Sequence, residues 1–371
     1  MRKLMIFGFI LVFAFVNCSK SEKVKNLNFE ETKGILASNF YKNISFVKLE
    51  MNEECLIFDP TEVKISGDKI FIVDKFAKVP NVFVFSISGD FIGKISRQGV
   101  GPGEYLLPGN LICNEENRKI YLTDLMKNEL LTYDLDSFAF LESFKIPFYS
   151  AFVEYLDRDH LIWYVSSGQK NESPFNCHIQ ITDFKCNPVK SWIDREDLSL
   201  NGPYNILSNF TQSENGVVFH HPFLNEYHLC SLKDSITPLL CLNFQNLNSP
   251  TKEYVASHAK NTAQSLGDDN MIQYCDLFEN DNSYHLYLGT KDKRIKARYD
   301  KKSNQGVYFQ VEDITDDLGL GLVGRPKGVY KNQYFSFIPT EDLQTIPSNS
   351  ILHKYIDNND LGKNPILMLY D

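Results

Sequence analysis

Lys69-Ile70-Phe71-Ile72-Val73-Asp74 and Lys119-Ile120-Tyr121-Leu122-Thr123-Asp124 are two closely similar stretches of this chain, and they decide the fold. Each is a run of β-branched, aromatic and other apolar residues that ends in Asp, which is typical of a strand followed by a turn. A second apolar run follows each stretch, at residues 82–85 and 130–133, and these two runs start 48 residues apart. The sequence therefore contains a repeated unit of short antiparallel strands.

The repeat continues to the C-terminus. Four further equivalents of the second run follow at residues 178–181, 227–230, 296–299 and 366–369. The early intervals are regular, and the two longest leave room for insertions, where we expect a helix at residues 254–266 and another within 340–356.

A period in the forties with about four strands per unit is typical of β-propeller blades. The six equivalent runs predict an all-β fold, a six-bladed β-propeller with short helical insertions, over residues 41–371. Residues 44–50 alternate as a strand does, and we expect them to complete the blade that contains residues 366–370. A β-sandwich is the alternative, but it gives no reason for near-equal spacing.

The first residues have the features of an export signal. Two basic residues precede an apolar stretch at residues 4–16, which is too short to span a bilayer and matches the core of a signal peptide. Phe15-Val16-Asn17-Cys18 looks like a relaxed bacterial lipoprotein signal, which predicts a signal peptide at residues 1–17 and lipid attachment at Cys18. An ordinary secretory signal with Cys18 incidental is the alternative. Residues 18–40 are polar and are expected to be a tether.

Composition excludes one class of partner. The net charge is −9, so a protein that tracks nucleic-acid phosphates is not expected.

Seven cysteines remain besides Cys18, and no CxxC spacing is present, which gives neither a zinc ribbon nor a thioredoxin motif. A disulfide between Cys177 and Cys186, or between Cys230 and Cys241, is left open.

The most specific local string is Arg97-Gln98-Gly99-Val100-Gly101-Pro102-Gly103-Glu104-Tyr105. A phosphate-binding glycine loop must open a helix, and the following Leu106-Leu107-Pro108-Gly109-Asn110 is a poor first helical turn. We therefore interpret Gly99, Gly101, Pro102, Gly103, Glu104 and Tyr105 as a structural turn between two blades, where glycine supplies positive φ.

The order of strand and Asp, strand, Gly-Asp turn, strand and then this glycine string resembles the six-bladed β-propeller lipoproteins of Bacteroidota, which are related to NHL-repeat propellers. The resemblance covers residues 41–371 and is strongest over the first two units and the closing residues 364–370. It implies a cell-envelope protein held by an N-terminal lipid, with the outer membrane favoured and the membrane face left open.

No catalytic or metal-ligating residue is predicted. Asp74 and Asp124 both end a strand, and we interpret them as turn caps that bind downstream backbone N–H groups. The third unit has Val165-Ser166 at the comparable point, so no ring of carboxylates is expected. The aromatic residues near the unit edges are interpreted as packing between blades, with ligand stacking as the alternative; they are Phe148, Tyr149, Trp163, Tyr164, Tyr204 and Tyr330.

Three functions remain open at this stage. The first is a lipid-anchored binding module for a glycan, peptide or envelope protein. The second is a Ca²⁺-dependent hydrolase or lyase at the mouth of the central channel, as in the lactonases that this fold resembles, which requires at least three Asp, Glu or Asn side chains in one pocket. The third is a structural subunit of an envelope complex. The lack of catalytic motifs favours the first.

Overall fold

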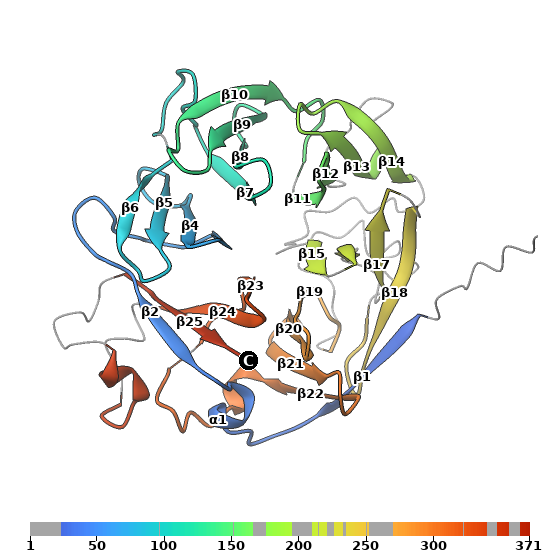
Figure 1. Cartoon of the computed structure of the whole chain (residues 1–371). Coiled ribbons are helices and arrows are strands. Elements are labelled where there is room, and N and C mark those ends of the chain that lie inside the picture. The colour runs from blue at the N-terminus through green and yellow to red at the C-terminus, as the bar shows by residue number, and fades with distance from the viewer. Residues whose placement is uncertain are drawn as a thin grey trace, which may run out of the picture.

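The computed structural model describes residues 24–95, 97–150, 152–165, 176–194, 210–213, 215–220, 226–232, 235–249, 251, 270–321, 323–339, 347–355 and 364–371. Within them the strands form four sheets of four strands and one sheet of nine. The sheets are arranged in a ring (Figure 1). The predicted all-β class is confirmed, and the arrangement is propeller-like.

The four-stranded sheets are antiparallel meanders. The first is β3 (Glu62–Ser66), β4 (Lys69–Asp74), β5 (Asn81–Ser86) and β6 (Phe91–Lys94). The second is β7 (Pro108–Asn114), β8 (Lys119–Asp124), β9 (Glu129–Asp134) and β10 (Phe140–Lys145). The third is β11 (Phe152–Asp157), β12 (His160–Tyr164), β13 (Cys177–Asp183) and β14 (Pro188–Asp194). The last is β23 (Gly328–Tyr330), β24 (Gln333–Ile338), β25 (Ile366–Tyr370) and β2 (Ser45–Lys48).

The nine-stranded sheet contains two more meanders on either side of one strand. One is β15 (Phe210–Ser213), β16 (Gly216–His220), β17 (Glu226–Ser231) and β18 (Ser235–Phe244), and the other is β19 (Tyr274–Glu279), β20 (Ser283–Gly289), β21 (Arg294–Asp300) and β22 (Gln305–Gln310). Between them lies β1 (Lys25–Glu31), which pairs in parallel with both β18 and β22.

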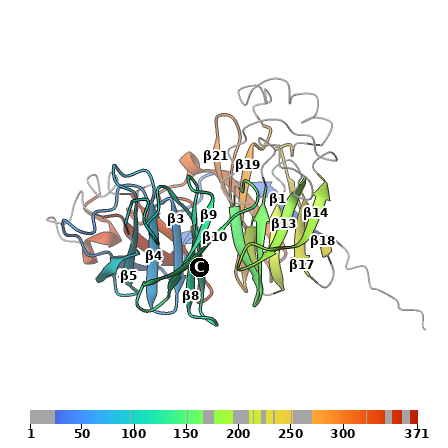
Figure 2. The same ribbon diagram turned by 90° about the horizontal axis from the view of Figure 1, so that it is seen from above.

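The repeat that the sequence predicts is present in the structure. Its six equivalent runs fall in β5, β9, β13, β17, β21 and β25, each of which is the third strand of its sheet when the strands are counted along the sheet from β3, β7, β11, β15, β19 or β23. In the view from above, the strands of neighbouring sheets run in similar directions (Figure 2). The repeated apolar runs thus mark the same strand position in all six meanders.

The two ends of the fold meet in one sheet, as expected. β2 pairs antiparallel with β25, with Ser45 opposite Leu369 and Lys48 opposite Ile366. The Asn364 side chain, 5% exposed, adds three hydrogen bonds across this junction: it accepts from the Ile57 amide and donates to the carbonyls of Glu50 and Cys55, each at 2.8 Å. These bonds tie the first and last parts of the fold together.

The prediction of a tether over residues 18–40 is wrong for its second half. Lys25–Glu31 is the inserted strand β1, and Leu27 and Phe29 on it are 0% and 2% exposed. The short helix α1 (Ala37–Phe40) is also packed into the core. The stretch looks polar because β1 buries only two of its seven side chains, and the partners that cover them lie more than 200 residues away.

The core lies between the sheets and not within one central cluster. One hydrophobic cluster packs between each pair of successive meanders around the ring, the last joining the β2–β25 sheet to the first meander. Four of the six candidate aromatic residues serve this packing: Phe148, Trp163 and Tyr164 are buried, and Tyr330 is partly buried against the cluster beside the first meander. Tyr149 is exposed, and Tyr204 lies outside the described residues.

The structure also bears on the predicted helices and on the cysteine pairings. The expected helix at 254–266 lies outside the described residues, and within 340–356 the described part holds the 3₁₀ helix η3 (Ile351–Lys354). A second 3₁₀ helix, η2 (Val311–Asp313), follows β22. Cys186 and Cys230 are buried thiols outside any disulfide, so neither of the two cysteine pairings left open forms in the structure.

Candidate functional site

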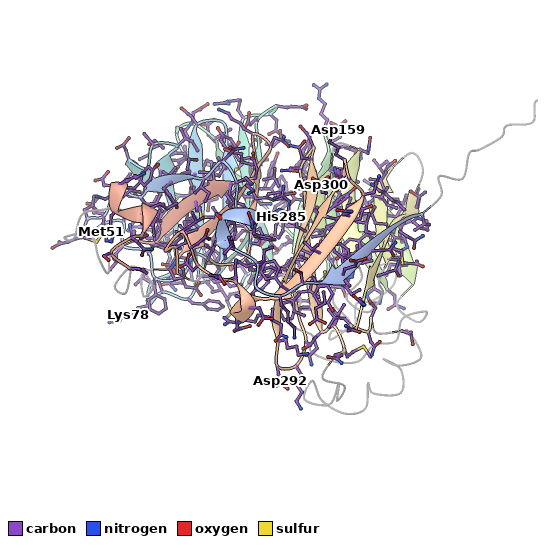
Figure 3. All side chains as sticks on the ribbon, turned by 90° about the horizontal axis from the view of Figure 1, so that it is seen from below. Met51, Lys78, Asp159, His285, Asp292 and Asp300 are labelled. Carbon is purple, nitrogen blue, oxygen red and sulfur yellow. The ribbon has the colours of Figure 1, made fainter. Side chains whose placement is uncertain are left out.

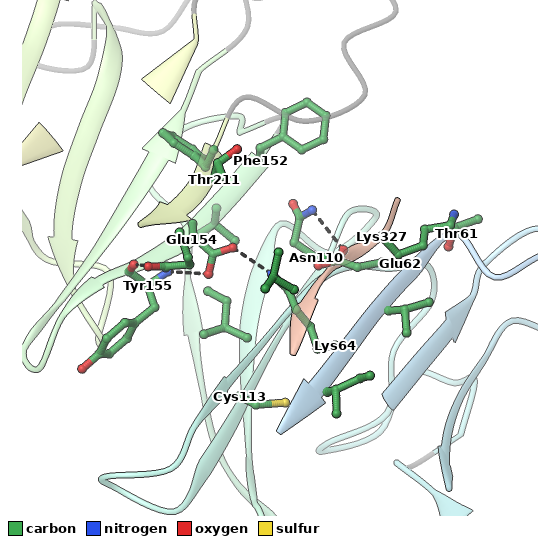
Figure 4. A pocket seen from close by; sticks show the side chains of 18 of the residues that line it. Thr61, Glu62, Lys64, Asn110, Cys113, Phe152, Glu154, Tyr155, Thr211 and Lys327 are labelled. Atoms are coloured by element: carbon green, nitrogen blue, oxygen red, sulfur yellow. Dashed lines mark hydrogen bonds and ion pairs between the residues drawn. The ribbon is translucent and has the colours of Figure 1, made fainter. Parts of the chain in front are cut away.

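A cavity of about 800 Å³ lies at the centre of the ring (Figure 4). Its walls come from the first strand of every meander: β3, β7, β11, β15, β19 and β23. These strands begin the repeats, and Figure 1 shows the labelled ones turned towards the centre. A volume of this size matches pockets for small molecules, which usually span 300–1,000 Å³.

Charged and polar side chains cross the cavity wall in a connected set (Figure 4). Lys64 on β3 pairs with Glu154 on β11, with 2.8 Å between Nζ and Oε2. Glu62, also on β3, accepts hydrogen bonds from the Asn110 side chain and from the Leu111 amide, both at 3.1 Å. Three different meanders are thereby linked by polar contacts at the axis.

The protonation of this set follows from burial and from neighbouring charge. Burial raises the pKa of the Glu62 carboxyl above its ordinary value. Burial also opposes the charge on Lys64, but the carboxylates of Glu154 and Glu62 outweigh it and raise the pKa of Lys64. Lys64 is therefore a fixed cation that balances the carboxylates beside it.

A second charged group lies where the chain enters β23. Arg325 Nη1 pairs with Asp276 Oδ2 at 2.8 Å, and Asp276 is 2% exposed. Two residues later, Lys327 Nζ donates to the carbonyl of Pro60 at 2.8 Å. Both side chains line the cavity, and Pro60 directly precedes the segment that leads into β3. This end of the cavity, where the innermost strands begin, is called the mouth below.

Apolar side chains lie at the same end. Phe76 and Leu125, in the turns after β4 and β8, line the cavity and are 64% and 41% exposed. Phe58, whose amide donates to Asp74, is 76% exposed. Sequence reasoning missed these residues and the Arg325–Lys327 pair. The available signal was position: Phe76 and Leu125 come two residues and one residue after the repeated strand-ending Asp.

Asp74 and Asp124 sit beside the mouth and bind backbone groups. Asp124 accepts from the amides of Leu106 and Leu107 at 2.7 and 3.3 Å, and from the downstream amides of Met126 and Lys127 at 2.9 and 3.1 Å. Asp74 accepts from the amides of Phe58 and Asp59 at 2.7 and 3.3 Å. Each carboxylate therefore holds the segment entering the first strand of its own meander as well as a turn.

The glycine-rich string forms a closed loop between β6 and β7. The Glu104 carboxylate accepts from the Gly101 amide at 2.9 Å and from Arg97 Nε at 2.6 Å, and these contacts lower the pKa of Glu104. Gly103 has φ +73°, as expected for a turn glycine. Gly99 is required for space instead, because a Cβ there would collide with the Glu104 carboxylate.

Of the two remaining residues of the string, Tyr105 packs inwards and Pro102 is exposed. Tyr105 is fully buried in the cluster between the first two meanders. Pro102 precedes Gly103, whose carbonyl accepts from the Tyr133 hydroxyl at 2.7 Å. The loop thus makes contacts within the protein that account for its sequence, and Cys18, the expected lipid site, lies outside the described residues.

Within the described ranges, no three His, Cys, Asp or Glu side chains are grouped so that they could hold a metal ion. Asp74 and Asp124 do not converge with a third carboxylate there. Cys113 lines the cavity, but burial raises its pKa, which keeps the thiol protonated. The described part of the cavity wall thus presents polar and charged side chains, Lys64, Glu154 and Glu62 among them.

Comparison with known proteins places the chain in a family. Its fold is similar to the crystal structure of a protein inferred to be exported from Bacteroides fragilis NCTC 9343, with a TM-score of 0.81, 18% identity and coverage of 94% of this chain and 99% of that one. A member of the DUF4221 family from Bacteroides vulgatus ATCC 8482 is also similar, with a TM-score of 0.54, 8% identity and coverage of 89% and 96%.

No curated protein is similar enough to match. In the described residues, no helix has the length and apolar character needed to cross a membrane. The family described as domain of unknown function DUF4934 matches residues 22–371, which includes the inserted strand β1 and every meander of the ring. The chain therefore belongs to the DUF4934 family.

Proposed function

We propose that this chain is an envelope β-propeller with six blades, held by a lipid at Cys18, that binds a glycan or peptide in its central cavity. Six four-strand meanders around one axis support the blade number. The apolar stretch before Cys18 and the similarity to a protein inferred to be exported support the location. An envelope protein is the alternative partner, docking on the same mouth.

One observation carries the binding role: a cavity of about 800 Å³ to which all six innermost strands contribute. The hydrophobic clusters between the sheets form the core of this fold. Folding therefore does not require a wide cavity with polar side chains along the axis. Its wall offers Lys64, Glu62 and Asn110 for hydrogen bonds and the exposed Phe76 ring for stacking on a sugar or an apolar side chain.

A thermal-unfolding screen of residues 19–371 against glycans and peptides tests this role. A ligand at about 100 times its Kd stabilises the folded state by about 2.7 kcal/mol, which raises Tm by several degrees. The variant Ser66→Trp narrows the cavity, because Ser66 lines it, and should weaken binding at least tenfold. Ser88→Trp is the matched control in an exposed turn away from the lining residues.

Equal affinity in the two tryptophan variants would place the ligand outside the cavity. A screen without any response would contradict the small-ligand role and favour an envelope protein, to be sought by pull-down from membranes. The same scans with CaCl₂ and with chelator test the Ca²⁺-dependent hydrolase alternative. A fall in Tm on chelation that CaCl₂ restores would support a metal site and would justify lactone and ester assays.

A further inference from the structure

We propose that the mouth of the cavity recognises the carboxylate of an acidic saccharide through Lys327 and Arg325. This inference rests on the binding role proposed above and narrows the class of ligand.

The two cations lie on a short segment that backbone hydrogen bonds hold against β24. Gly324 and Lys327 donate their amides to the carbonyls of Phe337 and Phe335 at 3.1 and 2.8 Å, just before β23 begins. Arg325 and Lys327, separated by one residue, both line the cavity.

Arg325 is oriented by its partner. The guanidinium has five N–H donors, and its Nη1 is fixed by the nearly fully buried carboxylate of Asp276. The planar head is then pre-organised to offer further donors to a second carboxylate in the cavity. Arginine binds carboxylates in this fork-like way more strongly than neutral donors do.

Lys327 carries a positive charge that forms no ion pair within the described residues. Its ammonium donates to the Pro60 carbonyl, and no ion pair joins it to any residue in the described ranges. Burial first, and then the charge of Arg325, lower the pKa of Lys327 to about 8, although the carboxylates of Asp59, Asp276 and Glu62 act in the opposite direction. A bound anion would stabilise this partly buried cation.

The surroundings favour a sugar as the carrier of the carboxylate. Phe76 offers an exposed ring at the mouth, and Asn110, Glu62 and Gln212 place amide and carboxylate groups along the wall. Sugar rings stack on aromatic faces, and their hydroxyl groups form hydrogen bonds with amide and carboxylate groups.

Isothermal titration at pH 7 and low salt tests the inference with glucuronate, glucose 6-sulfate and glucose. We expect glucuronate to bind at least tenfold more tightly than glucose. Lys327→Gln should abolish that preference, whereas Lys327→Arg should retain it. Lys331→Gln removes the same charge from an exposed turn outside the cavity and should bind as the native protein does.

The pH dependence separates direct charge recognition from a structural effect. In the native protein, glucuronate affinity should fall as the pH rises through about 8 and beyond, because Lys327 must be protonated to bind the anion. Lys327→Arg should remove this fall. Equal affinity for glucose and glucuronate, an unchanged preference in Lys327→Gln, or tighter binding of the sulfate would overturn the carboxylate assignment.

The proposed function can survive that failure. If a neutral glycan or a peptide binds and Ser66→Trp weakens it, the cavity is the binding site and only the acidic-saccharide inference is wrong. If none of the three sugars binds, the inference is wrong, and the broad screen decides separately on the cavity.

Discussion

At the scale of single residues, His285 on β20 is a buried base without a partner. It is 1% exposed, its ring stacks on Tyr334 with centroids 4.0 Å apart, and neither ring nitrogen has a hydrogen-bond partner among the described residues. Figure 3 shows it inside the molecule. Burial first, then the charges of Arg298 and Lys296, hold the pKa of His285 well below its ordinary value.

Stability should therefore depend on pH through this residue. The folded state keeps His285 neutral, whereas the unfolded chain takes up a proton below about pH 6.5, so acid favours unfolding. The loss should approach about 1.4 kcal/mol per pH unit below that point. His285→Leu should flatten the curve of unfolding free energy between pH 7 and 5, measured with urea. His160→Leu, at a histidine beside Asp157 and partly exposed, is the control. An identical slope in native and His285→Leu proteins would contradict this account.

At the scale of one element, the loop from Arg97 to Tyr105 demonstrates how a glycine can be required twice over. Gly103 has φ +73°, and a Cβ there would lie 2.5 Å from Phe140 Cγ on β10. Gly103→Ala should destabilise the fold by about 1–3 kcal/mol, from backbone strain together with the collision. Gly93→Ala on β6 is the matched control, because nothing lies within 4 Å of its added Cβ and its φ is not positive. Chemical denaturation measures the stability of both variants. Equal midpoints would show that the loop rearranges around the added Cβ at no cost in stability.

At the scale of the whole molecule, the sequence predicts the repeat of strands, but it predicts only part of what closes the ring of sheets. The strands at residues 69–74 and 119–124 could be predicted because an apolar run with a terminal Asp is a local feature that recurs. β2 was also predictable, since residues 44–50 alternate. β1 was not, because its two apolar residues acquire meaning only beside β18 and β22. The mouth was not predictable either: it joins segments near residues 59–76 to residues 325–327, and no local pattern connects them.

The last prediction concerns β1 and the stability of the whole ring. Backbone pairing with β1 joins two meanders that would otherwise contact each other only through side chains. It pairs with β18 over five residues, from Lys25 opposite Leu240 to Phe29 opposite Phe244, and then with β22. Phe29 also stacks on Phe244 with centroids 4.6 Å apart. A chain that starts at Lys33 would lose this strand and expose the edges of both neighbours, which invites pairing with other chains.

We expect such a chain to unfold at a clearly lower temperature than one that starts at Val24, and to aggregate more readily in light scattering. Phe29→Ala tests the same contact without truncation and should cost about 3–5 kcal/mol, the usual cost of removing a buried Phe. Glu30→Ala, exposed on the same strand, should change little. Equal melting of the two truncated chains would mean that the ring is closed by β2 and the sheet-to-sheet clusters. A large difference would mean that a segment close in sequence to the proposed lipid site at Cys18 is itself part of the closure of the ring.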